Sequence, residues 1–176
     1  MTTYPVSQLV SAHFKALSTI DGQALADLAQ RGSVTTGPRP EGMLQEILEG
    51  SSGAGLLFGV EGGAPGSAKA YLAATQTGNY LHIEEVAVER RLRRRGLGTA
   101  LIDAAKKECV TRSLEGITLT TDRLLPSNLG FYRALGFEAI EYASCPAHLR
   151  DVIAAECAIF RDPSRRTAMI WRAESR

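Results

Sequence analysis

The chain has 176 residues, of which 44% are hydrophobic and 22% are charged, and its formal net charge at pH 7 is +1. This length suits a single domain, and the composition is that of a globular protein able to bury roughly two-thirds of its unfolded surface. Without a strong net charge, an apolar run of about 18 residues or a signal-peptide layout, the sequence predicts a cytoplasmic protein that binds neither nucleic acid nor a membrane.

The N-terminal half alternates short apolar runs with turn residues. We expect an extension over 1–9 and then, in chain order, a strand over 10–17, a helix over 20–31, a break rich in proline and glycine over 35–40, and a helix over 41–49. Three strands joined by hairpin-type turns should follow over 55–60, 68–75 and 80–88.

The C-terminal half alternates helices with strands. Helices are expected over 98–113, 128–135 and 146–160, and strands over 117–121, 137–142 and 167–171. Hairpins in the first half and helical crossovers in the second imply one α/β domain over residues 10–176, in which a mixed sheet carries helices on its faces. The three cysteines, Cys109, Cys145 and Cys157, lack C-x-x-C spacing, so we expect neither disulfides nor a metal site.

One stretch between a strand and a helix carries most of the functional information. It reads Val86-Ala-Val-Glu-Arg-Arg-Leu-Arg-Arg-Arg-Gly-Leu-Gly-Thr99 and holds five arginines over residues 90–95. The first amides of a helix have no partner within it, and the helix dipole favours negative charge there. Gly96 and Gly98 permit close approach of a ligand to the backbone, and the arginines add positive charge. The stretch lacks the ending of a P-loop and the third glycine of a dinucleotide fingerprint, but it predicts a pyrophosphate site.

A second motif, Asn128-Leu-Gly-Phe-Tyr-Arg-Ala-Leu-Gly-Phe137, begins about 35 residues after Arg93. With Arg93-x-x-Gly96-x-Gly98 it resembles the GNAT superfamily of acetyl-CoA-dependent N-acyltransferases, whose members share the signature Gln/Arg-x-x-Gly-x-Gly/Ala and a Phe-Tyr-x-x-Leu-Gly-Phe tail. The order of elements agrees from about residue 10 to the C-terminus. The resemblance implies a mixed, mostly antiparallel sheet flanked by helices. Arg94 departs from the family pattern, which usually has glycine at this position.

The resemblance implies acetyl-CoA as co-substrate and identifies the segments that would hold it. The backbone of Val86, Ala87 and Val88 is expected to bind pantetheine and the acetyl carbonyl in the manner of an added strand. The phosphates would lie in a cradle formed by Arg93, Arg94, Arg95, Gly96, Leu97, Gly98 and Thr99, and Asn128 would contact the cofactor as well. The alternative interpretation of the loop is a solvated basic surface or a docking patch for an acidic partner.

The chemistry that the resemblance implies needs a proton donor for the departing thiolate, and Tyr132 is the candidate general acid. Its position four residues after Asn128 places both side chains on one face of a helix, so both could face the cofactor. The alternative is a packed aromatic residue whose hydroxyl forms a local hydrogen bond.

The general base is expected on the strand that precedes the arginine-rich loop. Alternation places His82 and Glu84 on one face together with Val86 and Val88, whereas Glu85 points the other way unless a bulge shifts the register. His82 is either a base or a half-buried edge residue. Glu84 either accepts the proton or binds the substrate ammonium.

We therefore expect direct attack of a primary amine on acetyl-CoA. Residues 20–49 and 143–166 should build the acceptor side, and an aminoglycoside, an amino acid, a polyamine and a protein N-terminus all remain open as acceptors. His13 and His148 have no partner in the sequence and are expected to be structural or exposed. The main alternative is a non-catalytic acyl-CoA-binding or regulatory module, ahead of a nucleic-acid binder, which would need aromatic residues near the loop. By family analogy, the last helix and strand could pair two copies into a homodimer.

Overall fold

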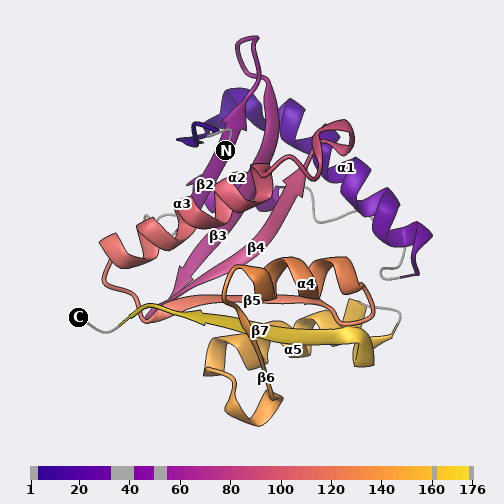
Figure 1. Ribbon diagram of the computed structural model, residues 1–176, viewed down its shortest axis with the longest axis vertical. Coiled ribbons are helices and arrows are strands. Elements are labelled where there is room, and N and C mark those ends of the chain that lie inside the picture. Colours follow the sequence, from indigo (N-terminus) through magenta and orange to yellow (C-terminus); the bar gives the residue numbers. More distant parts are fainter. Residues whose placement is uncertain (1–3, 33–41, 50–54, 160–161, 175–176) are drawn as a thin grey trace.

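The computed structural model describes residues 4–32, 42–49, 55–159 and 162–174, and a seven-stranded sheet lies at its centre (Figure 1). The strands are β1 (Ser7–Gln8), β2 (Gly55–Glu61), β3 (Ala68–Thr77), β4 (Tyr80–Val88), β5 (Gly116–Asp122), β6 (Glu138–Ile140) and β7 (Arg166–Arg172). They lie in the order β1-β2-β3-β4-β5-β7-β6, and all neighbours are antiparallel except β4 and β5. The predicted mixed, mostly antiparallel sheet is therefore confirmed.

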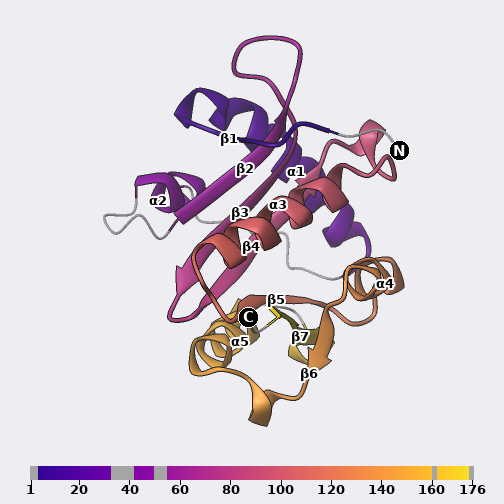
Figure 2. The ribbon, with the colours of Figure 1, turned by 60° about the vertical axis from the view of Figure 1, so that its left-hand side comes forward.

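Helices cover both faces of this sheet. They are α1 (Phe14–Gln30), α2 (Met43–Glu49), α3 (Leu97–Thr111), α4 (Pro126–Ala134) and α5 (Ala147–Ile159). α3 and α4 pack on one face through residues such as Leu101 and Phe131. α1 and α2 cover the other face through Leu17 and Ile47, and α5 lies against β5 and β7 on that same side (Figure 2). No helix in the described ranges is long and apolar enough to span a membrane.

The first strand lies elsewhere than the sequence predicts. β1 pairs with β2, and a 3-10 helix over Ser11–His13 then leads directly into α1. The strand expected over 10–17 is wrong because apolar residues at helical spacing, with Leu17 and Ile20 buried against the sheet, outweigh a weak alternation. The helix consequently begins six residues before its predicted start at 20.

From β2 onwards, the expected helices and strands are confirmed within a few residues of their predicted bounds, and β4 agrees at both ends. Three further 3-10 helices, Arg90–Leu92, Tyr142–Ser144 and Pro163–Arg165, lie in the connections. The break expected over 35–40 lies outside the described residues. The local pattern was sufficient for these elements because their apolar periodicity is continuous.

β4 contains a bulge that changes which side chains share a face. Opposite β3, Ile83 pairs with Ala74 and Glu85 pairs with Ala73, so Glu84 is the extra residue. An extra residue breaks the strict alternation of a strand, and the side chains beyond it exchange faces relative to the predicted pattern.

The predicted common face of His82, Glu84, Val86 and Val88 is therefore wrong. The two valines pack into the apolar cluster beneath α3, whereas His82 contacts the opposite side, towards α5. Glu85 lies on the face of His82, because its partner on β3 belongs to the cluster beneath α1. This is the outcome that the sequence allowed for a bulged strand.

β4 and β5 diverge halfway along their length. Their parallel pairing ends where Ile83 lies opposite Leu119, although β4 continues to Val88 and β5 to Asp122. The separation of the two strands is visible to the right of their paired ends (Figure 1). Beyond Ile83, no strand among the described residues pairs with the edge of β4 that faces β5, and the arginine-rich loop follows the end of β4.

Candidate acyl-CoA site

The arginine-rich stretch forms the strand–loop–helix junction that its sequence predicts. β4 runs into the 3-10 turn over Arg90–Leu92, and α3 begins at Leu97 with Gly96 as its N-cap at φ +88°. The amide of Ala100 donates to the carbonyl of Gly96 at 3.0 Å. The three amides before it have no acceptor within the helix. The start of α3 therefore offers backbone donors and a positive dipole end to an anion.

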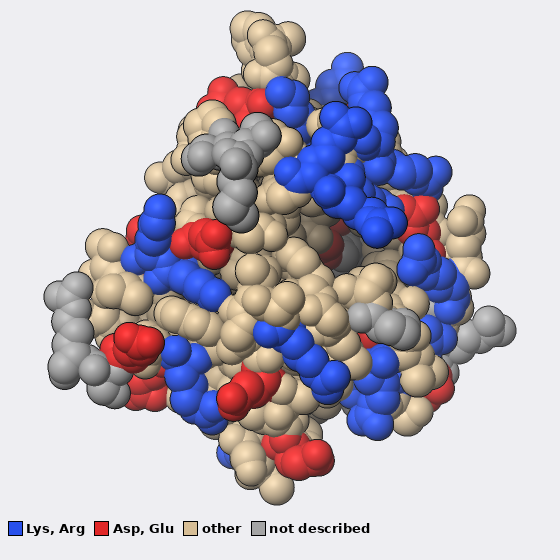
Figure 3. All heavy atoms as spheres, viewed as in Figure 1, with Lys and Arg blue, Asp and Glu red and all other residues tan. Residues whose placement is uncertain are grey.

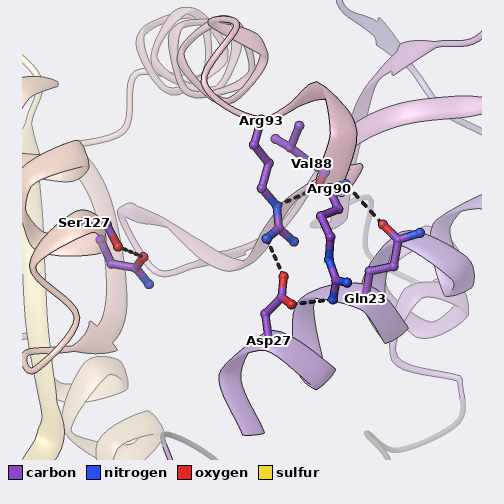
Figure 4. Close-up of polar contacts among 7 residues, drawn as sticks. Gln23, Asp27, Val88, Arg90, Arg93 and Ser127 are labelled. Carbon is purple, nitrogen blue, oxygen red and sulfur yellow. Dashed lines mark hydrogen bonds and ion pairs between the residues drawn. The ribbon is translucent and has the colours of Figure 1, made fainter. Parts of the chain in front are cut away.

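The side chain of Arg93 points to α1 (Figure 4). Its Nε donates to the carbonyl of Val88 at 3.2 Å, and its Nη1 pairs with one carboxylate oxygen of Asp27. Arg90 pairs with the other oxygen of Asp27, and its amide donates to Oε1 of Gln23 at 3.1 Å. We call this arrangement of Asp27, Arg90 and Arg93 the Asp27 clamp, because it fastens the loop to α1.

The Asp27 clamp has an electrostatic signature. Burial acts to raise the pKa of Asp27, but hydrogen bonds and charges from Arg93 and Arg90 outweigh it and hold the pKa below its usual value. The carboxylate is therefore charged at neutral pH and neutralises part of the loop's positive charge. A contact between the Arg93 side chain and a phosphate stays a prediction, since that guanidinium already holds a carboxylate.

Arg94 and Arg95 lie exposed beside the start of α3, and neither forms an ion pair or side-chain hydrogen bond with the described part of the chain. Their neighbour Arg91 differs, because it pairs with Glu89 at 2.5 Å. Figure 3 shows basic side chains gathered over this loop. Arg94 has φ +61°, a left-handed conformation that favours glycine. Arg94 adopts this conformation at the position where the family that the sequence resembles usually has glycine.

Gly98 is needed for packing between helices. A Cβ at Gly98 would lie 3.2 Å from Cζ of Phe131 on α4 and 4.0 Å from Cγ2 of Val88. At Gly96 the nearest atom to an added Cβ would be Cε2 of Tyr4, at 4.0 Å. From the sequence, Gly98 was expected to let a ligand lie close to the backbone. In the structure, Gly98 also lets α3 lie close to α4.

Tyr132 is half-buried on α4, where its ring lies 5.1 Å from that of Phe131 and 5.7 Å from that of Phe137 between centroids. Burial and, after it, the negative charge of Glu85 raise the pKa of the Tyr132 phenol, while Arg166 acts in the opposite direction. The phenol therefore keeps its proton at neutral pH and can donate it. The two interpretations of Tyr132 as a packed ring and as a proton donor are compatible in this position.

Asn128 lies in the first turn of α4, one helical turn before Tyr132. Its amide donates to the carbonyl of Leu125 at 2.9 Å, and the Ser127 hydroxyl donates to its Oδ1 at 3.4 Å (Figure 4). The side chain of Asn128 is half-buried. A contact between Asn128 and a cofactor stays a prediction.

His82 is buried, with 3% of its surface exposed. Its Nδ1 lies 3.0 Å from Oγ1 of Thr118, its partner in the β4–β5 register. The same hydroxyl oxygen lies 3.1 Å from Nε2 of His148 on α5. Burial and, after it, the nearby His148 lower the pKa of His82 to about 4. The imidazole of His82 is therefore neutral at pH 7 and able to accept a proton.

His148 has contacts that the sequence does not indicate. Besides Thr118, its ring lies 5.4 Å from the ring of Tyr80 between centroids. No spacing along the chain could reveal these contacts, because the three residues of the hydrogen-bonded series come from β4, β5 and α5. His13, in contrast, is structural as expected, with Nδ1 at 3.2 Å from the carbonyl of Val10.

The bulge places two carboxylates side by side on β4. Glu84 is exposed, whereas Glu85 is half-buried and close enough to Tyr132 for its charge to raise the pKa of the phenol. Proton transfer to Glu84 and ammonium binding by Glu84 both stay predictions. Glu85 joins the site only through the bulge, and the signal for it in the sequence is the change of phase from Leu81 and Ile83 to Val86 and Val88.

Comparisons with known proteins identify the family and agree with the fold. A profile of the acetyltransferase (GNAT) family matches residues 24–137. An acetyltransferase of the GNAT family from Staphylococcus aureus Mu50 aligns with a TM-score of 0.73 at 14% identity, over 98% of this chain and 100% of the other. The ribosomal-protein-S18-alanine N-acetyltransferase of Escherichia coli aligns with a TM-score of 0.68 at 15% identity, over 99% and 96%. The PaiA N-acetyltransferase of Thermoplasma acidophilum, solved with coenzyme A, aligns with a TM-score of 0.67 at 12% identity, over 98% and 100%.

Proposed function

Because this chain belongs to the acetyltransferase (GNAT) family, we propose that it transfers an acetyl group from acetyl-CoA to a primary amine by direct attack in a ternary complex. The observation that carries the proposal is a coincidence of three features. The start of α3, the arginine-rich loop and the divergence of β4 from β5 all lie at the same end of β4. The coenzyme A found with the PaiA N-acetyltransferase, which has the same fold, supports the assignment of the ligand.

The residues at this end of β4 fit the parts of acetyl-CoA. Its pyrophosphate suits the unpaired amides at the start of α3 together with the exposed charges of Arg94 and Arg95. Its pantetheine arm carries amide groups, which suit the edge of β4 over Val86–Val88 that has no strand partner towards β5. Acetyl-CoA supplies the activated acyl group for the reaction.

Tyr132 and His82 would then handle the protons of the transfer. The Tyr132 phenol, kept protonated by burial and by Glu85, donates to the departing sulfur. His82, held neutral by burial, accepts the proton that the attacking amine must lose. The amine would approach from the face covered by α1, α2 and α5, because His82 and Glu85 lie on that face.

Calorimetry with acetyl-CoA tests the binding part of this proposal. We expect micromolar binding by the native chain and a roughly tenfold weaker Kd for the double variant Arg94→Ala/Arg95→Ala, which removes charges that contact no other described residue. Arg91→Ala is the matched control, because it removes another exposed arginine of the same loop that is already paired with Glu89. Its Kd should stay close to the native value.

Release of free thiol from acetyl-CoA in the presence of candidate amines tests the reaction part. Turnover with at least one class of amine supports the transferase. A folded native chain that binds no acetyl-CoA would overturn the proposal. Binding without turnover, unaffected by Tyr132→Phe, would favour the non-catalytic acyl-CoA-binding module instead.

A further inference from the structure

His82, Thr118 and His148 form a continuous polar series from β4 through β5 to α5. Thr118 is fully buried, yet its single hydroxyl lies within hydrogen-bond distance of both imidazoles, at 3.0 Å from Nδ1 of His82 and 3.1 Å from Nε2 of His148. One hydroxyl between two imidazoles can accept from one ring and donate to the other. Such an arrangement has the form of a proton path.

The two ends of the series meet different environments. His82 is the last residue but one of β4 that pairs with β5, so it lies directly before the divergence of the strands. Because Nδ1 contacts Thr118, Nε2 lies on the other side of the ring, and it forms no hydrogen bond with a described residue. At the other end, the His148 ring is half-exposed on α5.

We propose that Thr118 and His148 are positioning residues that carry the proton of the attacking amine away from His82 to the surface of α5, an inference that rests on the proposed function. Nε2 of His82 accepts the proton from the amine nitrogen as the new amide bond forms. The proton on Nδ1 passes to Oγ1 of Thr118, and the hydroxyl proton of Thr118 passes to Nε2 of His148. One proton enters at Nε2 of His82 and one reaches Nε2 of His148, from which it passes to solvent. His82 is then the Nε2–H tautomer, so proton exchange with solvent water must restore Nδ1–H, and the Thr118 hydroxyl must turn back to His148, before the next turnover.

This direction requires one arrangement of protons in the resting protein. Both histidines must carry their proton on Nδ1, so that His82 donates to Thr118 and Thr118 donates to His148. Nε2 of His82 then has a free lone pair towards the amine. The opposite tautomer of His82 would place a proton on Nε2 and block acceptance there.

The surrounding charges favour transfer from His82 to His148. Burial and, after it, His148 lower the pKa of His82 to about 4. Burial also lowers the pKa of His148, but Asp151 on the same helix acts to raise it. Among the described residues, other charged groups near this face are Glu84 and Glu85 of β4, Glu115 and Arg172 beside Tyr80, and Glu156 of α5, which pairs with Arg166 of β7. Thr75, opposite His82 on β3, carries no charge.

The relay has a defined pH dependence. A proton acquired by His148 from solvent occupies the lone pair of Nε2 that must accept from Thr118. Turnover should therefore be lost as the pH falls through the pKa of His148, while acetyl-CoA binding persists. Removal of the Thr118 hydroxyl breaks the hydrogen-bond series between the two histidines. Protonation of His148 should then no longer lower turnover.

Thr118→Val and Thr118→Ser form the decisive pair of variants. Valine keeps the shape of the side chain but lacks the hydroxyl, whereas serine keeps the hydroxyl. We expect Thr118→Val to lower kcat by roughly tenfold or more with an unchanged KM for acetyl-CoA, and Thr118→Ser to recover most of the loss. Thr121→Val is the matched control, because Thr121 is a buried threonine of the same strand outside the series. A Thr118→Val enzyme with native kcat and pH profile would overturn the relay.

Histidine tautomers in the unliganded protein provide a readout that does not depend on activity or on folding of a variant. Two-bond 1H–15N spectra of the native chain should show the Nδ1–H tautomer for both His82 and His148. An Nε2–H tautomer on His82 would overturn the relay. If acetyl-CoA fails to bind in the calorimetric experiment, the proposed function fails by itself, and the spectra still decide whether the hydrogen bonds run in the stated direction.

Discussion

The two sides of the candidate site are built in different ways. The phosphate side comes from one continuous stretch, the loop and first turn of α3, and its unpaired arginines lie on the surface. The chemical side draws single residues from β4, β5, α4 and α5, and places them in or beside buried surroundings: His82, Thr118, Tyr132 and His148. An anion site can therefore be recognised in a local motif, whereas a path for protons depends on the register of distant strands.

Tyr132→Phe tests the chemical side. Its effect should be larger than that of Asp27→Asn or Arg94→Gly, which affect the loop on the phosphate side. Loss of the phenolic proton donor is expected to lower kcat about a hundredfold, with the Kd for acetyl-CoA unchanged, because the ring still packs against Phe131 and Phe137. Steady-state kinetics and calorimetry measure the two quantities separately. A weaker Kd for acetyl-CoA with native kcat would show that Tyr132 serves binding and not proton transfer. The distinction between the phosphate side and the chemical side would then be wrong.

Asp27→Asn tests how firmly α1 holds the loop. The variant leaves Arg90 and Arg93 without their carboxylate, and we expect the free energy of unfolding at pH 7 to fall by about 1 kcal/mol, a value kept small because both arginines are partly exposed. The lowered pKa of Asp27 means that its contribution is present above the unfolded pKa of about 4 and disappears as the pH falls through the folded pKa.

Urea unfolding of the native and Asp27→Asn chains at pH 7 and near pH 3 measures this difference. The gap between the two chains should narrow at the lower pH. Asp103→Asn, an exposed aspartate of α3, is the control and should show little change at either pH. A gap that widens in acid would contradict the assignment of the clamp to a charged Asp27.

Arg94→Gly should have the smallest effect and should separate stability from binding on the phosphate side. Glycine relieves the left-handed backbone at φ +61° and should raise the free energy of unfolding by up to about 1 kcal/mol, while acetyl-CoA binding weakens through loss of a charge. Ser113→Gly is the matched control, because Ser113 has φ +56° at the far end of α3. Thermal melting should show a similar gain for it, and calorimetry an unchanged Kd.

The sequence predicted those parts of the site that depend on neighbouring residues. The bounds of β4, a helix that starts within one residue of the start of α3, and the placement of Asn128 and Tyr132 on one helix were all predicted from local pattern or motif. The strand expected over 10–17 failed because two local periods competed there, and packing of Leu17 and Ile20 against the sheet decided between them.

Contacts between residues far apart in the sequence could not be predicted from local pattern. Asp27 meets Arg93 although 66 residues separate them, and His82 meets Thr118 across 36 residues. The bulge at Glu84 arises from the pairing of β4 with Ala73 and Ala74 of β3. Within β4, the buried apolar residues change phase across Glu84-Glu85, from Leu81 and Ile83 to Val86 and Val88, and this change is the signal in the sequence that could have found the bulge.

By itself, the sequence determined the family, the order of the elements and the strand–loop–helix junction proposed to bind an anion, because apolar periodicity and the amides of a helix start are properties of contiguous residues. Only the tertiary structure decided which side chains surround the candidate site. It placed Glu85 rather than Glu84 on the face of His82, directed Arg93 to α1, and joined His82 to His148 through Thr118. Strand register and helix packing set these contacts, and both are fixed by burial summed over the whole core.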